Sequence, residues 1–439
     1  MKVVHLPYVY FPDASGGTEY YVKGLAQGLA QLGIDNLIVA PGARSSQYVH
    51  EGLLVVRLPV SPDVLSLREL YGEGDACVAD HLNKVIDEWH PDIVHFHGFT
   101  SAISLSMLKA VKSKNIPTVM TYHTSTVSCP RGTLLRWGEK ICDGKMFTHR
   151  CSQCSLHGLG MNRILSFLVG ALPPIAGQWL GDHDFEGGIW TALRMSELIK
   201  LRHQTIHTMW EMVDRVVVLS EWTHHLLLTN EIPDEKMVLI RHGLTQPPAP
   251  KKLDRAEREA TDPLRLVFLG RMDPLKGPDI IVKALQQIPE ANITLDMYGI
   301  VQGEKEHAYQ VDLLSIISGD KRIRLYPPLA GEAVIKLLQN YDALVVPSKL
   351  LETGPLVVLE AFAAGIIVIG SNLGGIAEWV ENGKNGILVS PNDIEAWVEA
   401  LQDLISKQEL LQRLTRGIVM PRTIGDVAKE MQALYATLV

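Results

Sequence analysis

The stretch ALVVPSKLLETGPLVVLEAFAAG, residues 343–365, contains an apolar strand, a short loop and an apolar helix in direct succession. Proline is tolerated at the first position of a helix and glycine often follows the last, so the helix is expected to begin near Pro355 and to end at Gly365. Glu352 then lies on the loop, and Glu360 lies about one and a half turns into the helix. A strand followed at once by a helix is the unit from which parallel α/β sheets are built.

The start of this helix has the properties of an anion-binding site. The first backbone amides, near Leu356 and Val357, have no carbonyl partner within the helix, and Gly354 precedes them. They can bind a diphosphate or sugar hydroxyls, with the two carboxylates on either side. A carboxylate accepts hydrogen bonds from vicinal hydroxyls, which suits a ribose or a hexose. The alternative for Glu360 is a solvated helix face, although Leu359 and Phe362 beside it argue for burial.

A second anion-binding turn is expected in GRMDPLKG, residues 270–277. Arg271 and Lys276 stand between the strand at 264–270 and the helix that begins near 278. Backbone amides and the helix dipole favour an anion at such a turn, and a phosphate is the natural ligand. The alternative is a surface turn with solvated charges.

The alternation of strands and helices continues through the whole chain. It predicts two doubly wound α/β domains with parallel sheets. We place an N-terminal domain at 1–245, a C-terminal domain at 246–420, and a last helix at 421–439 that packs back on the first domain. The proline-rich and charged segment at about 246–262 has linker composition. Ligands of such domains bind at the carboxyl ends of the strands, and a cleft between the two domains is the expected place.

Composition excludes several classes of protein. The chain has 439 residues, 46% of them hydrophobic and 21% charged, which excludes a disordered or collagen-like chain. The net charge of −8 provides no electrostatic basis for binding nucleic acid. The first residues, MKVVHLPYVYFP, are typical of a buried strand rather than a secretion signal. We therefore expect an intracellular, cytoplasmic protein without a membrane-spanning helix.

These motifs together resemble a known enzyme family. The pair Glu352 and Glu360, separated by seven residues, occurs with GRMDPLKG, GGIAEWV and NGILV, and in the first half with SGGTEYYV, HFHG, TYH and VVVLSEWT. In this order they resemble the retaining glycosyltransferases of family 4, which have the GT-B fold. The resemblance spans almost the whole chain. It implies transfer of a sugar from a nucleotide-diphosphate sugar to a glycan or lipid-linked acceptor.

The resemblance also implies roles for individual residues in the C-terminal domain. Arg271 and Lys276 would neutralise the diphosphate, Glu360 would accept the ribose hydroxyls, and Glu352 would contact the transferred sugar. The chain departs from the usual family pattern at three positions near this site, which bear on the donor-sugar contacts: Thr353, Pro355 and His242.

In the N-terminal domain the resemblance implies roles for three residues. His123, at the end of TVMTYH, would lie beside the reacting sugar, although a histidine satisfied at a strand end is the alternative. Gly16 and Gly17 would allow the first loop to approach the diphosphate and the acceptor closely.

The mechanism implied by the resemblance is a same-face substitution in which the departing diphosphate takes the acceptor proton. Its chemistry requires no metal ion. Two other functions stay open, a GT-B nucleotide-sugar epimerase or hydrolase and a non-catalytic zinc-bearing scaffold.

An insertion at about residues 124–210 contains four cysteines, at positions 129, 142, 151 and 154. Cys151 and Cys154 form a C-x-x-C pair, and Cys129 and Cys142 precede glycine-containing turns. Four thiolates suit tetrahedral zinc, and we predict a structural zinc ion bound by Cys129, Cys142, Cys151 and Cys154. An iron–sulfur cluster, a pair of disulfides and no metal at all are the alternatives.

The same insertion has the strongest local positive charge of the chain. Six basic residues stand against two acidic ones between Cys129 and Arg163, and the apolar segment RILSFLVGALPPIAGQWL follows. Cationic and apolar residues together favour peripheral contact with an anionic membrane at its inner face. A buried hairpin of the N-terminal domain is the alternative for the apolar segment.

Overall fold

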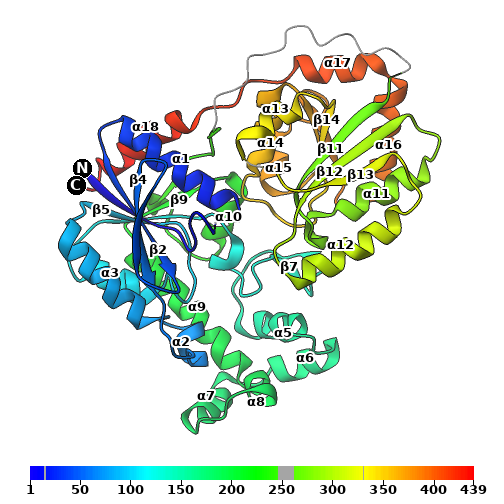
Figure 1. The fold of residues 1–439 in the computed structure, drawn as a ribbon. Coiled ribbons are helices and arrows are strands. Elements are labelled where there is room, and N and C mark those ends of the chain that lie inside the picture. The colour runs from blue at the N-terminus through cyan, green and yellow to red at the C-terminus, as the bar shows by residue number, and fades with distance from the viewer. Residues whose placement is uncertain (14–15, 246–261, 330) are drawn as a thin grey trace. The chain divides into compact units, whose positions relative to one another are not determined.

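The computed structural model describes residues 1–13, 16–245, 262–329 and 331–439 (Figure 1). By its internal contacts the chain divides into two compact units. Unit 1 comprises Met1–Arg241 together with Gly425–Val439, and unit 2 comprises His242–Ile424. The linker expected at about 246–262 lies outside the described residues except for Asp262.

Unit 1 is built on an eight-stranded sheet in the order β10-β9-β6-β5-β1-β2-β4-β3. All neighbouring strands are parallel except β3 and β4, an antiparallel pair that the sequence pattern did not predict. The strands are β1 (Lys2–Leu6), β2 (Asp35–Gly42), β3 (Ser46–His50), β4 (Leu53–Pro59), β5 (Ile93–Phe96), β6 (Thr118–Thr121), β9 (Arg215–Val218) and β10 (Met237–Leu239). The central strands β1, β5 and β6 are buried along their length except at Lys2, as expected for strands covered on both faces.

The helices of unit 1 connect these strands and extend into the insertion. They are α1 (Gly17–Gln31), α2 (Leu67–Tyr71), α3 (Ala76–Trp89), α4 (Leu105–Lys112), α9 (Met195–Met212), α10 (Glu221–Thr229) and the terminal α18 (Ile424–Tyr435). The insertion adds the short hairpin β7 (Leu135–Arg136) and β8 (Lys140–Ile141), followed by α5 (Thr148–Gly158), α6 (Arg163–Gly170), α7 (Pro174–Asp182) and α8 (Gly188–Leu193).

Unit 2 has a six-stranded parallel sheet in the order β13-β12-β11-β14-β15-β16. The strands are β11 (Leu264–Arg271), β12 (Ile293–Ile300), β13 (Ile323–Tyr326), β14 (Ala343–Val346), β15 (Ile367–Ser371) and β16 (Gly386–Val389). The helices are α11 (Pro278–Gln287), α12 (Glu304–Ile317), α13 (Val334–Leu338), α14 (Leu356–Ala364), α15 (Gly374–Trp379), α16 (Ile394–Ser406) and α17 (Gln408–Arg416).

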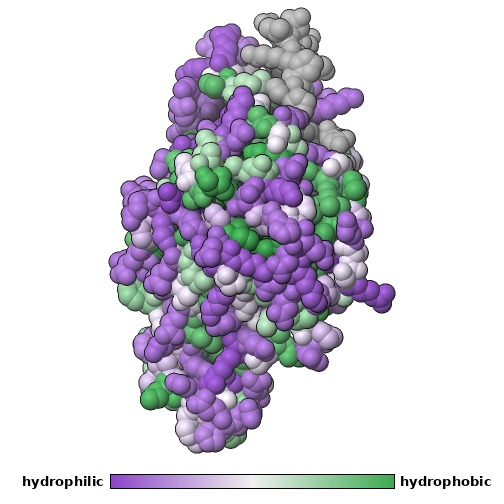
Figure 2. All heavy atoms as spheres, turned by 90° about the vertical axis from the view of Figure 1, so that its left-hand side faces the viewer, coloured by the Kyte–Doolittle hydropathy of each residue, from purple (hydrophilic) through white to green (hydrophobic). Residues whose placement is uncertain are grey.

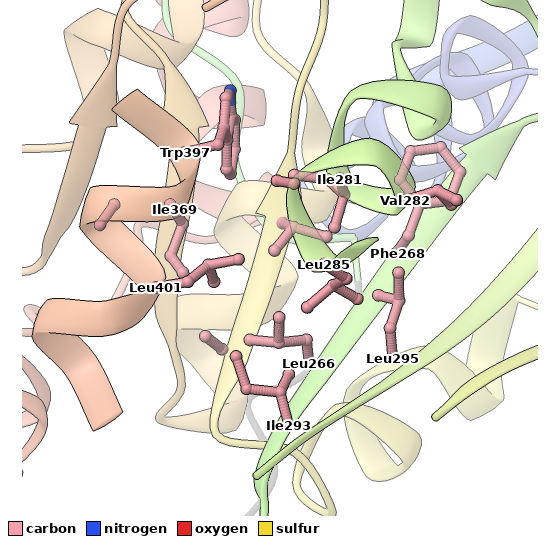
Figure 3. Close-up of a cluster of buried hydrophobic side chains, with 14 of the residues drawn as sticks. Leu266, Phe268, Ile281, Val282, Leu285, Ile293, Leu295, Ile369, Trp397 and Leu401 are labelled. Carbon is pink, nitrogen blue, oxygen red and sulfur yellow. The ribbon is translucent and has the colours of Figure 1, made fainter. Parts of the chain in front are cut away.

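Alternation along the strands of unit 2 creates a core on each face of the sheet. Leu266 and Phe268 pack with Trp397 and Leu401 on one face, as Figure 3 shows. Val267, between them in the chain, packs on the other face among side chains of α14 and α15. Because successive side chains of a strand point to opposite faces, the apolar run of β11 supplies both cores. The predicted doubly wound architecture is therefore confirmed in unit 2.

Candidate active site

Both sheets have a topological switch point at their first strand. In unit 2 the chain runs from β11 to β12 on one side and later returns to β14 on the other; in unit 1, β1 likewise lies between β2 and β5. Loops leaving such a strand and its neighbour diverge at the carboxyl edge and leave room for a ligand. The residues predicted from the sequence follow these strands.

The two loops at the switch point of unit 2 are joined by backbone contacts. The amide of Lys349 donates to the carbonyl of Leu275 at 2.8 Å. Gly277 has a φ of +70°, and a Cβ added to it would lie 2.1 Å from the carbonyl oxygen of Pro347. A larger residue therefore could not occupy position 277 without moving the loop after β14 away from the loop after β11.

Glu352 lies at the junction of these loops. Its Oε1 atom accepts a hydrogen bond from Lys276 Nζ at 2.5 Å and one from Ser348 Oγ at 2.6 Å. Burial alone would raise the pKa of Glu352, but the Lys276 ammonium, the Ser348 hydroxyl and the charge of Arg271 together hold this pKa below its ordinary value. The carboxylate is thus ionised and fixed in place before any ligand arrives.

The two predicted cations differ in how they are held. Lys276 is paired with Glu352, and 24% of its side chain is exposed. Among the described residues Arg271 has only long ion-pair contacts, 3.8 Å to Asp273 and 4.0 Å to Glu306, and 39% of its side chain is exposed. Lys276 is therefore positioned by the protein, whereas Arg271 has the freedom to turn towards an anion.

Helix α14 begins at Leu356, directly after the loop that contains Glu352. The amide of Gly375 donates to the carbonyl of Glu352 at 2.7 Å, so the start of α15 supports that loop. A Cβ at Gly354 would lie 2.9 Å from the ring of His242. The amides of Leu356 and Val357 belong to the first turn of α14, whose donors have no carbonyl partners within the helix. The structure thus brings these amides to the same loop as Glu352.

Glu360 lies in the second turn of α14 and is partly buried. Burial raises its pKa to about 7. A carboxyl with this pKa changes its charge near neutral pH and is sensitive to any partner that favours the ionised form.

In unit 1, His123 follows β6 and is buried. The Tyr21 ring of α1 packs against it edge to face, with ring centroids 4.9 Å apart. Gly16 immediately precedes α1, and its amide donates to Glu19 Oε2 at 2.8 Å. A Cβ at Gly16 would be 3.6 Å from the same oxygen, an ordinary contact, so packing within the described residues does not require glycine there. Glycine would be required at position 16 if a ligand approached the backbone closely there. Gly17 is the first residue of α1.

Three buried histidines near His123 were not predicted to take part in the site. His5 on β1, His95 on β5 and His97 directly after β5 lie together, and His97 Nδ1 is 3.1 Å from His123 Nε2. In the HFHG motif, His95 and His97 are two residues apart, so on a strand their side chains lie on the same face. This spacing could have predicted that the two histidines lie together. Its connection to His5 and His123 depends on strand order, which the motif does not contain.

The loop after β1 is held by another residue that sequence reasoning missed. The Arg57 guanidinium is buried and donates through Nη2 to the carbonyl oxygen of Tyr10 at 2.6 Å and to Asp13 Oδ2 at 3.0 Å. This arginine therefore anchors the loop that leads to Gly16.

The structure does not support the predicted zinc ion. All five cysteines are free, and among the described residues no cysteine belongs to a group of three potential ligand atoms within 4.8 Å of one another. Cys154 Sγ accepts a hydrogen bond from the Trp137 amide at 3.4 Å. Burial, with a contribution from Cys129, raises the pKa of the Cys151 thiol to about 12.

The insertion is held by an apolar cluster instead. Leu156 of α5 packs with Met195 and Ile199 of α9, and Cys151 packs against this cluster. The other half of this cluster comes from α9, which is distant in sequence.

Two family models match the chain. "Glycosyltransferase Family 4" matches residues 15–152, and "Glycosyl transferases group 1" matches residues 250–418. The chain thus contains two segments that match glycosyltransferase domains. The family 4 domain contains His123, and the group 1 domain contains Arg271, Lys276, Glu352 and Glu360.

Relatives of these domains include D-inositol 3-phosphate glycosyltransferases. That of Rhodococcus jostii is 33% identical over 172 residues, which is 37% of this chain and 38% of the relative. The match therefore spans well under half of that relative's length. That of Xylanimonas cellulosilytica is 24% identical over 96% of this chain and 92% of its own.

Solved structures confirm the GT-B fold. Sucrose-phosphate synthase from Thermosynechococcus elongatus superposes with a TM-score of 0.68 at 18% identity, covering 100% of this chain and 98% of that one. HepE of Anabaena in complex with UDP-glucose superposes with a TM-score of 0.64 at 15% identity, covering both chains completely.

Proposed function

We propose that this protein is a retaining glycosyltransferase that moves a sugar from a nucleotide-diphosphate sugar to a glycan or lipid-linked acceptor. The observation that carries the proposal is the contact of Lys276 and Ser348 with Glu352 at the switch point, in the loop that directly precedes the first turn of α14. The names of the relatives and the UDP-glucose bound to HepE support the same reaction class.

The leaving group determines what the site has to do. When the bond between the sugar and the diphosphate breaks, negative charge grows on the diphosphate oxygens. Lys276, Arg271 and the amides of Leu356 and Val357 supply positive charge or donors at this point, and preorganised donors are usually the largest single source of rate enhancement. The stabilisation of the leaving diphosphate that is proposed for these groups requires no metal ion.

The two carboxylates have separate roles in this proposal. Glu352, ionised and fixed by Lys276 and Ser348, accepts hydrogen bonds from hydroxyls of the transferred sugar. Glu360, which ionises near neutral pH, accepts hydrogen bonds from the ribose hydroxyls of the nucleotide.

The proposed substitution occurs on one face of the sugar. The acceptor hydroxyl oxygen bonds to the anomeric carbon on the face that the diphosphate leaves, and the hydroxyl proton passes to the departing diphosphate oxygen. This route retains the anomeric configuration without a carboxylate nucleophile of the kind that retaining glycosidases use.

The direct test is transfer by Lys276→Ala, compared with Lys384→Ala. Lys384 pairs with Glu381 on the surface of the same unit, so its loss controls for removing a lysine ion pair. We expect Lys276→Ala to reduce kcat at least one-hundredfold, since removing one preorganised donor typically costs about 10²–10³ in rate. Lys384→Ala should retain wild-type activity. Transfer by Lys276→Ala within about threefold of wild type would contradict the site assignment.

The product separates the proposal from its two alternatives. A glycosyltransferase yields a glycosylated acceptor of unchanged anomeric configuration, detectable by NMR. Conversion or hydrolysis of the sugar nucleotide without an acceptor would instead indicate an epimerase or hydrolase. Absence of nucleotide binding in a thermal-shift screen of sugar nucleotides would indicate a scaffold.

We also propose that α6, α7 and α8 contact a lipid surface, with the enzyme at the cytoplasmic face of a membrane. The apolar segment is not a buried hairpin, so that alternative was wrong. Large apolar side chains are exposed on all three helices: Ile164, Leu165, Phe167, Leu168, Ile175, Trp179 and Ile189. On α6 the four exposed side chains have the spacing of one helical face. Figure 2 shows a face of the molecule on which hydrophilic residues predominate.

The shape of this segment favours contact over crossing. Among the described residues no single helix combines the length and apolar composition needed to cross a bilayer. Taken together, α6 and α7 reach the required length and apolar composition, but they are bent by 80° at their junction. Amphipathic helices of this kind lie in the interface between headgroups and acyl chains.

Flotation with vesicles of phosphatidylcholine and phosphatidylglycerol tests this contact. The variant Phe167→Ser/Leu168→Ser should lose vesicle binding, whereas Val311→Ser/Leu314→Ser, which removes exposed apolar side chains from α12, should bind like wild type. Failure of the wild-type chain to float with the vesicles at low salt, or equal binding by both variants, would exclude the proposed surface.

A further inference from the structure

A row of hydrogen-bonded side chains runs through unit 1 from β2 to His123. Asn36 Oδ1 is 3.0 Å from His5 Nε2, His5 Nδ1 is 3.0 Å from His97 Nε2, and His97 Nδ1 is 3.1 Å from His123 Nε2. All three histidines are buried, with exposures of 0%, 1% and 8% in that order. The row lies at the switch point of unit 1, because His5 and His97 belong to β1 and to the end of β5.

The direction of the first hydrogen bond is determined by the amide of Asn36. Its Nδ2 atom donates to the carbonyl oxygen of Ile34 at 2.7 Å, so Oδ1 is the atom that faces His5. A carbonyl oxygen only accepts, and His5 Nε2 must therefore donate.

A neutral imidazole donates from one nitrogen and accepts at the other. With its proton on Nε2, His5 accepts at Nδ1, and His97 must donate from Nε2. By the same reasoning His97 accepts at Nδ1, and His123 must donate from Nε2. The rings of His5 and His97 are neutral near pH 7, since burial lowers the pKa of His5 to about 4 and that of His97 well below its ordinary value.

We propose that Asn36 sets the tautomer of His123 through His5 and His97, so that the lone pair of His123 is on Nδ1. Asn36, His5 and His97 are positioning residues, and none of them needs to contact a substrate. How the lone pair is used rests on the proposed function: Nδ1 of His123 accepts a hydrogen bond from a hydroxyl of the reacting sugar or of its acceptor. The opposite tautomer would present an N–H group, which cannot accept.

A metal ion held by His5, His95 and His97 is the competing interpretation, because their ligand atoms lie within 4.8 Å of one another. The nitrogens of His95 already have other partners. Nδ1 is 2.6 Å from the Tyr435 hydroxyl, and Nε2 is 2.7 Å from Thr121 Oγ1. Both nitrogens of His5 are likewise within hydrogen-bond distance of Asn36 and His97. The contacts therefore favour a hydrogen-bonded row over a metal site.

Nitrogen NMR of the full chain labelled with ¹⁵N in the histidine rings tests the row directly, because the two tautomers have distinct ring-nitrogen shifts. Signals are assigned by single His→Gln variants. We expect His5, His97 and His123 to carry their protons on Nε2 at pH 7. A proton on Nδ1 of His97 or His123, a charged ring in the row, or a stoichiometric metal ion lost in His95→Gln would overturn the proposal.

Two variants separate the row from general effects on the fold. Asn36→Leu removes the acceptor at the start of the row, and we expect the tautomer of His123 to become mixed. Thr121→Val removes a hydrogen bond from His95, a buried histidine outside the row, and should leave His123 unchanged. An unaltered His123 signal in a folded Asn36→Leu variant would contradict the role of Asn36.

Activity separates this inference from the proposed function. Asn36→Leu should lower kcat about tenfold with little change in KM for the donor, whereas Thr121→Val should not. Normal transfer by Asn36→Leu, despite a mixed tautomer of His123, would contradict the proposal that the lone pair on Nδ1 of His123 is used in catalysis. Absence of any transfer by the wild-type chain, with the expected tautomers present, would remove the proposed function and leave the row intact.

Discussion

Glu360 is a carboxyl group whose charge changes near neutral pH. Burial raises its pKa to about 7, and in the proposed site only the ionised form accepts both ribose hydroxyls. A nucleotide that binds the ionised form must release the proton when it binds below pH 7.

We therefore predict that nucleoside diphosphate affinity falls about tenfold between pH 8 and pH 6, as expected for a single group with a pKa near 7. Isothermal titration at several pH values measures it. In Glu360→Gln the change of about tenfold in affinity that is due to Glu360 should be absent. The pH dependence that arises from titration of the ligand's own phosphate should remain. An equal pH dependence in both proteins would show that Glu360 does not control binding.

The same carboxyl predicts a change in stability with pH. Its pKa in the folded chain lies above the ordinary value of 4.5, so between about pH 4.5 and 7 the folded state binds more protons than the unfolded state. The contribution of Glu360 to stability therefore falls as pH rises through this window. Chemical denaturation should show Glu360→Gln gaining stability over wild type at pH 8 but not at pH 4. A constant difference across this range would contradict the raised pKa.

At this scale the sequence indicated candidate site residues but not the side chains that contact them. Lys276 and Glu352 were assigned to different parts of the donor, and the structure shows them hydrogen-bonded across 76 residues of chain. Ser348 was missed because a lone serine in a loop has no distinguishing pattern. The catalytic and binding roles of these residues stay predictions.

At the scale of elements, the contact between the two switch-point loops of unit 2 depends on Gly277. Gly277 and Gly383 both have positive φ angles, +70° and +77°, so alanine costs a similar backbone strain at each. Only at Gly277 does the new Cβ meet backbone, 2.1 Å from the carbonyl oxygen of Pro347; at Gly383 nothing lies within 4 Å.

We predict that Gly383→Ala costs about 1 kcal/mol of unfolding free energy and that Gly277→Ala costs at least about 2 kcal/mol more. Urea denaturation compares the two variants. Gly277→Ala should also lose transfer activity, because the loops of Lys276 and Glu352 must separate. Equal stability losses would show that the loops tolerate displacement.

The sequence patterns predicted some features of the helices and strands but not others. Apolar runs predicted most strands because a buried strand in a doubly wound sheet is apolar on both faces, and the GT-B fold was confirmed. The cysteine spacing suggested zinc, yet spacing does not determine where sulfur atoms point. The apolar segment of α6 and α7 has the composition of a core, and only the structure shows that it is exposed.

For the whole molecule, the terminal helix returns from unit 2 to unit 1. Its buried side chains are Val427, Ala428, Met431, Leu434 and Tyr435, and the Tyr435 hydroxyl is 2.6 Å from His95 Nδ1. Burial of a large apolar side chain is worth about 1.5–3 kcal/mol. The last fifteen residues therefore supply a considerable part of the stability of unit 1.

We predict that deleting Gly425–Val439 lowers the unfolding free energy of unit 1 by more than about 4 kcal/mol and leaves the transition of unit 2 unchanged. Deleting only Leu438 and Val439 is the control, since this removes no buried side chain of α18. Differential scanning calorimetry resolves the two units if they unfold separately. Identical thermograms for the two deletions would contradict a structural role for α18.

The return of α18 has a consequence for biosynthesis. A ribosome releases the strands of unit 1 first, then all of unit 2, and only afterwards the helix that supplies Tyr435 to His95. Domains tend to fold in order of synthesis. Here the later unit can reach its native state while the earlier one still lacks a helix, so the buried His95 acquires Tyr435 as a neighbour only after unit 2 has been synthesised. A nascent chain arrested before residue 425 would contain nearly all of unit 2 but an unfinished unit 1.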